Sequence, residues 1–95
     1  MAGTLLTDAD VAALLAAHPH RRREGDRLAR EYSFPSFAEA FEFMTDVAAI
    51  AERLNHHPDW SNSYGRVVVT ITDHDAGGLS SNDRLFVAEV DRLDR

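Results

Sequence analysis

The chain has 95 residues, a formal net charge of −6 and no cysteine. This length predicts a single domain over residues 1–95, near the small end of what buries its own core, and oligomerisation often completes such burial. The negative charge disfavours non-specific binding of nucleic acid. The absence of cysteine excludes disulfides and thiolate metal sites. Because no apolar run is long enough to span a membrane and no secretory pattern opens the chain, we expect a cytoplasmic protein that binds no membrane.

The first predicted element is a helix that begins after Thr7, whose hydroxyl can cap it. Pro19 ends this helix after roughly three turns. Its narrow apolar stripe consists of Val11, Leu14 and Leu15. We expect His18 and His20, at the exit of the helix, to be exposed polar residues.

A β-hairpin is predicted next, with its turn at Gly25. Residues 28–34 alternate, so that Leu28, Tyr32 and Phe34 face one side of the second strand. The three arginines at 21–23 are a weak sign of an anion site in an acidic chain. We therefore assign them to the solvent face of the hairpin.

A long helix is predicted from about Ser36 to His56, on the order of 30 Å in length. Its apolar face consists of Phe37, Phe41, Met44, Ala48 and Ala51, widened by Ala40, Phe43, Val47, Ile50 and Leu54. A stripe of this kind indicates core packing. Pro58 disfavours the helical conformation at His57, so the two adjacent histidines occupy the last turn and its exit. Glu52 lies on the same face as His56 and can hydrogen-bond its imidazole and raise its basicity.

The second half of the chain predicts two extended segments and a final helix. Residues 60–64 form a short extended piece, and residues 66–72 are the clearest strand, rich in β-branched side chains. His74 follows this strand in a loop, where a side chain can face a cleft. The last helix begins near Ser80, which has capping-box spacing with Asp83. Its predicted buried side consists of Leu85, Phe86, Val90 and Leu93.

Three of the five histidines fall between positions 56 and 74, and histidine exchanges protons most readily near neutral pH. Zinc ligation is one alternative, with Asp75 or Glu52 as a carboxylate ligand. Adjacent histidines, however, point about 100° apart on a helix, and the His-Glu-x-x-His pattern is absent. Nucleophilic catalysis would need a cysteine or a serine elbow. The residues favour metal-free acid–base chemistry, such as an elimination or hydration, which needs no cofactor.

One combination of motifs is specific enough to indicate a family. It reads Glu52-x-x-x-His56-His57-Pro58-x-Trp60, then Tyr64, Thr70-x-Thr72-x-His74, Gly78-Leu79-Ser80 and Asp83. This pattern resembles the pterin-4a-carbinolamine dehydratase family, also called 4a-hydroxytetrahydrobiopterin dehydratases. The resemblance covers nearly the whole chain, from Leu5 to the last helix.

The resemblance implies an α+β fold, with three helices packed on one face of a four-stranded antiparallel sheet. It implies a lyase that dehydrates 4a-hydroxytetrahydropterin, left by aromatic amino acid hydroxylases, to quinonoid dihydropterin without metal or cofactor. It also implies a homodimer or homotetramer with a functional link to such a hydroxylase. Some relatives stabilise the dimer of a homeodomain transcription factor or assist protein assembly, so the alternative is a non-catalytic binding module on the same fold.

The resemblance also implies roles for particular residues. Carried over by position, the site consists of the catalytic His56, His57 and His74 and the supporting Glu52, Asn55, Trp60, Asp73 and Asp83. His56 and His74 would transfer protons, while His57 would shape the pocket. Glu52 would support His56. Asp83 has the alternative role of a helix-capping acid, and Trp60 that of a packing residue.

The chain departs from the family pattern in three places. Asn55 stands where aspartate is common, so a carboxylate is replaced by a hydrogen-bonding amide. Asp73 precedes His74 where threonine is common, and its carboxylate can hold His74 protonated. The tryptophan usual after the first helix is missing, with His20 or Arg21 in its region. None of these departures removes a proton-transfer group.

Overall fold

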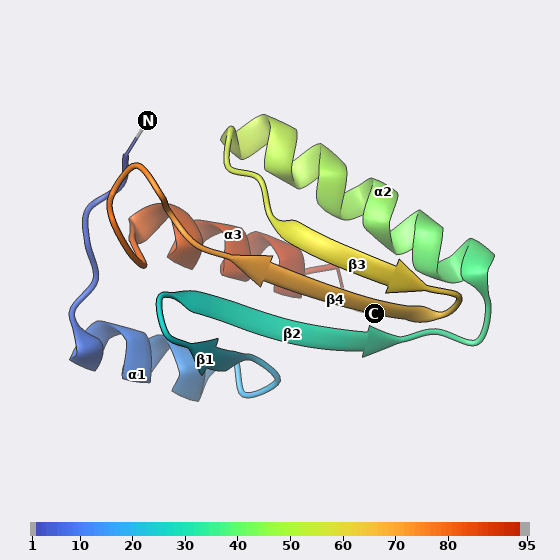
Figure 1. Ribbon diagram of the computed structural model, residues 1–95, viewed down its shortest axis with the longest axis horizontal. Coiled ribbons are helices and arrows are strands. Elements are labelled where there is room, and N and C mark those ends of the chain that lie inside the picture. Colours follow the sequence, from blue (N-terminus) through green and yellow to red (C-terminus); the bar gives the residue numbers. More distant parts are fainter. Residues whose placement is uncertain (1, 94–95) are drawn as a thin grey trace.

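The computed structural model describes residues 2–93. Its elements are, in order, α1 (Asp8–Ala17), β1 (Arg22–Glu24), β2 (Arg27–Ser33), α2 (Phe37–Leu54), β3 (Asp59–Ser63), β4 (Arg66–Ile71) and α3 (Ser81–Asp91). The four strands form an antiparallel sheet in the order β1-β2-β4-β3. The helices pack against one face of this sheet (Figure 1), which confirms the predicted α+β fold.

The register of β3 and β4 brings the histidine segments together. Asp59, the first residue of β3, pairs with Thr70 near the end of β4. In an antiparallel pair, the chain that enters one strand and the chain that leaves the other lie at the same end of the sheet. The His56–His57 pair enters β3 and His74 leaves β4, so both segments lie at this end.

The core lies between the helices and one face of the sheet. From the strands it contains Leu28, Tyr32, Val67, Val69 and Ile71, from α2 Ala40, Phe43, Val47, Ile50 and Ala51, and from α3 Phe86, Val87 and Val90. Three residues predicted to be buried are not. Phe37 and Phe41 are 48% and 54% exposed, and Leu85 is 48% exposed. The apolar arc of α2 is wider than the surface that the sheet and α3 cover, so its outer edge faces solvent.

The long helix ends two residues earlier than predicted. α2 stops at Leu54, and Asn55 adopts the left-handed conformation with φ 50° and ψ 45°. The amide of His56 then donates to the carbonyl of Ala51 at 3.0 Å, the bond that closes a Schellman-type helix end. Asparagine tolerates this conformation better than most residues. Both histidines therefore lie outside the helix.

The hairpin is confirmed, but one of its three arginines is not on the solvent face. Arg22 and Arg23 are exposed, whereas Arg21 is only 5% exposed. A buried guanidinium needs a counter-charge, and Asp91 at the end of α3 provides it, with Arg21 Nη2 at 2.7 Å from Asp91 Oδ1.

Candidate active site

The histidines from the two segments line one open cavity at the end of the sheet. This cavity has a volume of about 220 Å³ and is lined by Asn55, His56, His57, Thr72, Asp73, His74 and Asp75. The structure thus brings together all three histidines that the sequence singled out. Two further lining residues, Thr72 and Asp75, were absent from the predicted site; their position directly beside His74 in the chain was the available signal.

His56 is held by a buried carboxylate. Its Nε2 lies 2.7 Å from Oδ1 of Asp83, and Asp83 is fully buried in the first turn of α3. The imidazole also meets the ring of Phe86 edge-on, with centroids 6.4 Å apart. Glu52, the partner predicted for His56, does not contact it, because α2 ends before His56 and the ring turns toward α3.

The Asp83 carboxylate fixes the protonation pattern of this imidazole. Burial raises the pKa of Asp83, and hydrogen bonds from His56 and from the Ser80 amide offset part of that rise. When ionised, Asp83 can only accept hydrogen bonds, so it places a proton on Nε2 of His56. The Nδ1 nitrogen is then available to accept a proton.

His57 has a different and more exposed environment. Its Nε2 contacts Oε2 of Glu52, so the carboxylate predicted to support His56 supports its neighbour instead. The side chains of His57 and Glu52 are 54% and 78% exposed. Pairs this exposed contribute little to stability. The contact orients the His57 ring at the rim of the cavity.

His74 is exposed, and among residues 2–93 its side chain makes no hydrogen bond or ion pair. Asp73 does not hold it, contrary to the prediction. The Asp73 carboxylate is 4% exposed and turns away toward the start of α3, where Ser80 Oγ donates to its Oδ2 at 2.6 Å. The His74 imidazole is therefore open to solvent and held by no neighbouring side chain among the described residues.

Two further cavities adjoin this one and share its lining. One, of about 290 Å³, contains His57 together with Trp60, Pro58 and Ala51, so Trp60 lines an apolar hollow beside the histidines. The other, of about 320 Å³, contains His74 together with residues of the β1–β2 turn. The histidine cavity is therefore flanked by an apolar hollow on the side of His57 and by a charged hollow on the side of His74.

A larger cavity, of about 510 Å³, lies at the other end of α3. There His18 is not an exposed polar residue as predicted: its Nδ1 lies 2.7 Å from Oδ2 of Asp91. Asp91 also binds Arg21 and Arg30, at 2.7 and 3.1 Å. Among the described residues, the histidine that contacts Asp91 is His18, which belongs to this ion-pair cluster.

Two findings concern metal ions and membranes. Within residues 2–93, no three histidine, aspartate or glutamate side chains gather closely enough to hold a metal ion. In the same part of the chain, no helix is both long and apolar enough to cross a bilayer.

Together the fold and the site define a class: a small α+β domain whose sheet end presents three histidines from two segments. The model of the pterin 4 alpha carbinolamine dehydratase family matches residues 4–93. The chain belongs to this family.

Relatives of known sequence agree over nearly the full length. A protein from Synechococcus sp. (strain WH7803) is 44% identical over 90 residues, which cover 95% of this chain and 97% of that protein. A protein from Prochlorococcus marinus (strain MIT 9312) is 38% identical over 89 residues, covering 94% of this chain and 93% of that protein. Both are provisionally named pterin-4-alpha-carbinolamine dehydratases.

Two solved structures are similar in fold. The crystal structure of a transcriptional coactivator/pterin dehydratase from Brucella melitensis has a TM-score of 0.89 at 30% identity, covering 95% of this chain and 98% of that one. A pterin dehydratase-like protein identified as a RuBisCO assembly factor in the alpha-carboxysome has a TM-score of 0.62 at 26% identity, covering 77% and 84%. Proteins with this fold therefore carry both enzyme and non-enzyme names.

Proposed function

We propose that this protein dehydrates 4a-hydroxytetrahydropterin to quinonoid dihydropterin and water by metal-free histidine acid–base catalysis. One observation carries the proposal: His56, His57 and His74 line a single open cavity in a member of the pterin 4 alpha carbinolamine dehydratase family. The reaction would act in the cytoplasm and recycle the pterin cofactor of aromatic amino acid hydroxylases.

The reaction needs only two proton transfers. The C4a–O bond breaks as the hydroxyl takes a proton and leaves as water, and N5 loses a proton as the C4a–N5 double bond forms. We assign the base to Nδ1 of His56, because the buried Asp83 holds the proton on Nε2. We assign the acid to His74, which is exposed and has no partner among the described residues.

The remaining residues would shape the binding site. His57, oriented by Glu52, lies between the histidine cavity and the apolar hollow of Trp60. An aromatic heterocycle such as a pterin would gain from burial against this hollow. Asn55 would contribute by ending α2, which directs both adjacent histidines toward the cavity.

The test is direct. The purified protein is added to a phenylalanine hydroxylase reaction, and the decay of the 4a-carbinolamine is followed by its absorbance. We expect acceleration by the wild type and its loss in the His56→Ala and His74→Ala variants. A folded wild-type protein that gives no acceleration would contradict the proposal and favour a binding module on the same fold.

We also propose that the protein forms a homodimer or homotetramer. Phe37 and Phe41 form an exposed aromatic pair on α2, with ring centroids 5.8 Å apart, and covering this pair with a second copy of the chain would remove apolar surface from water. Light scattering after gel filtration should give a multiple of the chain mass, and Phe41→Glu should reduce it. A monomeric wild-type protein at micromolar concentration would contradict this.

A further inference from the structure

The segment before α1 packs against the loop and helix start that carry Asp73 and Asp83. Leu5 and Ser80 form an isolated antiparallel bridge. Around it, the Leu6 amide donates to the Leu79 carbonyl at 2.9 Å, and the Ser81 amide donates to the Thr4 carbonyl at 2.8 Å. Figure 1 shows this segment running beside the connection from β4 to α3. We call residues 3–6 the N-terminal strap.

Asp73 is the residue on which the strap and the helix start converge. Its Oδ2 accepts from the Gly3 amide at 3.0 Å, from Ser80 Oγ at 2.6 Å and from Asn82 Nδ2 at 3.2 Å. Its Oδ1 accepts from the Ala76 amide at 3.2 Å. Burial alone would raise the pKa of Asp73, but these hydrogen bonds hold it well below its usual range. The buried carboxylate is thus fully used by donors, and none of them comes from a histidine.

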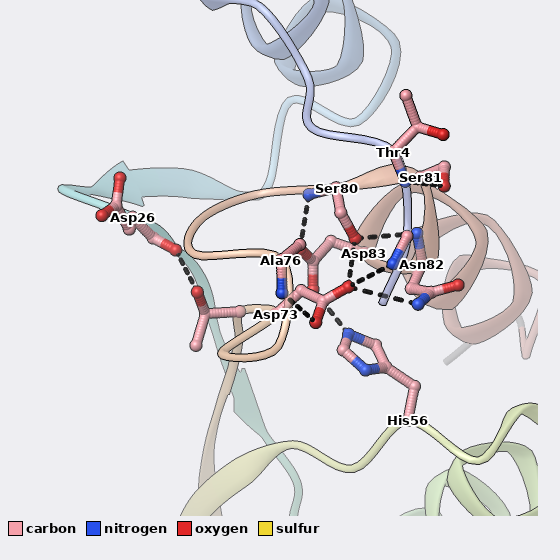
Figure 2. A network of polar contacts seen from close by, with 11 residues as sticks. Thr4, Asp26, His56, Asp73, Ala76, Ser80, Ser81, Asn82 and Asp83 are labelled. Atoms are coloured by element: carbon pink, nitrogen blue, oxygen red, sulfur yellow. Dashed lines mark hydrogen bonds and ion pairs between the residues drawn. The ribbon is translucent and has the colours of Figure 1, made fainter. Parts of the chain in front are cut away.

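One residue links this carboxylate to the one that holds His56. The hydroxyl of Ser80 donates to Asp73, and the main-chain amide of Ser80 donates to Oδ2 of Asp83 at 2.8 Å. The other oxygen of Asp83 contacts His56. Figure 2 shows the resulting series of contacts, from the strap through Asp73, Ser80 and Asp83 to the imidazole. Ser80 and Asp83 are both fully buried, so this series has little freedom to shift.

The strap fits so closely that a side chain at position 3 would require a neighbouring group to move. A Cβ atom on Gly3 would lie 2.6 Å from Ser80 Oγ and 2.9 Å from Ser81 Oγ. These distances are shorter than carbon–oxygen contacts permit, so a side chain there would displace Ser80, the strap or both.

We propose that Asp73 is a positioning residue for His56 and that the N-terminal strap, through Gly3, completes this role. The catalytic meaning of the positioning rests on the proposed dehydratase function. The positioning itself is a property of the Asp83–His56 contact and can be measured without turnover.

The experiment is a nitrogen-15 NMR measurement of the His56 ring in four variants. Asp73→Asn removes the charge and replaces one of the two accepting oxygens by an NH₂ group, which cannot accept a hydrogen bond. Gly3→Ala adds one carbon and removes no polar atom. Asp8→Asn is the matched control for the first, because Asp8 is 93% exposed and lies on α1. Ala2→Ser adds one atom to the exposed neighbour of Gly3 and is the control for the second.

In the wild type and both controls we expect a slowly exchanging Nε2 proton on His56, as the contact with buried Asp83 requires. In Asp73→Asn and Gly3→Ala we expect this proton to exchange at least about tenfold faster, with a mixture of tautomers. The same signal in all four variants would overturn the proposal. If Asp73→Asn does not fold, as its amide spectrum would show, Gly3→Ala decides the outcome alone.

A dehydration assay on the same variants separates the two proposals. We expect kcat to fall about tenfold to a hundredfold in Asp73→Asn and Gly3→Ala, with KM changed much less, because small misplacements of a catalytic group are costly. A wild type without activity would contradict the dehydratase function and leave the NMR result to decide the positioning. An active wild type whose His56 signal is the same in Asp73→Asn and Gly3→Ala would contradict the positioning role and leave the dehydratase function supported.

Discussion

The two oxygens of the Asp83 carboxylate have different partners. Oδ2 accepts from the Ser80 amide and closes the capping box of α3, while Oδ1 contacts Nε2 of His56. The sequence left two alternatives for Asp83, a helix-capping acid and a residue of the site. In the structure its carboxylate caps α3 and also contacts His56. The spacing Ser-x-x-Asp could predict the cap. It could not predict His56 as the second partner, because that contact depends on where α2 ends.

Asp83→Asn should reverse the proton pattern of His56 with little loss of stability. The amide oxygen can still accept from the Ser80 amide, which leaves the NH₂ group facing Nε2 of His56. Nε2 must then accept, and the ring proton moves to Nδ1, the nitrogen needed as a base. We expect the dehydration rate to fall by a factor on the order of 10² to 10⁴. Nitrogen-15 NMR identifies the tautomer; an unchanged tautomer with an unchanged rate would contradict this role for Asp83.

At the scale of elements, the end of α2 decides which carboxylate meets which histidine. A helix continued to His56 would place Glu52 beside it, as the sequence predicted. The left-handed conformation of Asn55 ends the helix at Leu54, and His56 then contacts Asp83 while His57 contacts Glu52. The signal was present in the asparagine itself, which is common at such helix ends.

Asn55→Ala and Asn55→Gly should differ in stability. Alanine in the left-handed region costs about 1 to 2 kcal/mol, whereas glycine adopts it without a Cβ penalty. We therefore expect urea denaturation to show Asn55→Ala less stable than the wild type by about 1 kcal/mol. Asn55→Gly should stay within about 0.5 kcal/mol of the wild type, because glycine adopts the left-handed conformation without strain. Equal losses in both variants would mean that the Asn55 side chain, and not its backbone, supports this corner.

At the scale of the whole molecule, the sequence predicted the layers well and the polar interior poorly. The strand alternation, the capping residues and the helix periodicity predicted the helices and strands, and the family resemblance predicted the α+β class. Arg21 and Asp73 are buried and His18 is half-buried, and each is held by a partner distant in the chain that no local pattern encodes. Asp91, which is 73 residues from His18, is the clearest case. Periodicity also could not predict which part of the apolar face of α2 remains exposed to solvent.

The Asp91 cluster should make stability depend on acid. Burial raises the pKa of Asp91, but the hydrogen bond and charge of Arg21, with His18 and Arg30, hold it below its usual value. The stabilisation from its ionised form is therefore full above the unfolded pKa of about 3.9 and is lost as pH falls through the lower folded pKa. Asp73 acts in the same direction. The free energy of unfolding of the wild type should therefore fall as the pH drops below about 3.9.

Asp91→Asn should remove part of this acid dependence and lower stability at neutral pH. It leaves the Arg21 guanidinium, whose side chain is 1% exposed, without its counter-charge. Breaking a buried pair in this way costs about 3 to 5 kcal/mol. Denaturant unfolding at pH 7 and pH 3 measures both effects, with the exposed Asp8→Asn as control. A pH 7 loss as small as that of the control would contradict the role of Asp91.

The most direct test of the central claim is a double-mutant cycle on His56 and His74 in the carbinolamine dehydration assay. If both imidazoles act on one substrate in one cavity, their losses are not independent. The double alanine variant should then be about as slow as the slower single variant. Losses in kcat that multiply, or single variants as fast as the wild type, would contradict a shared catalytic pocket.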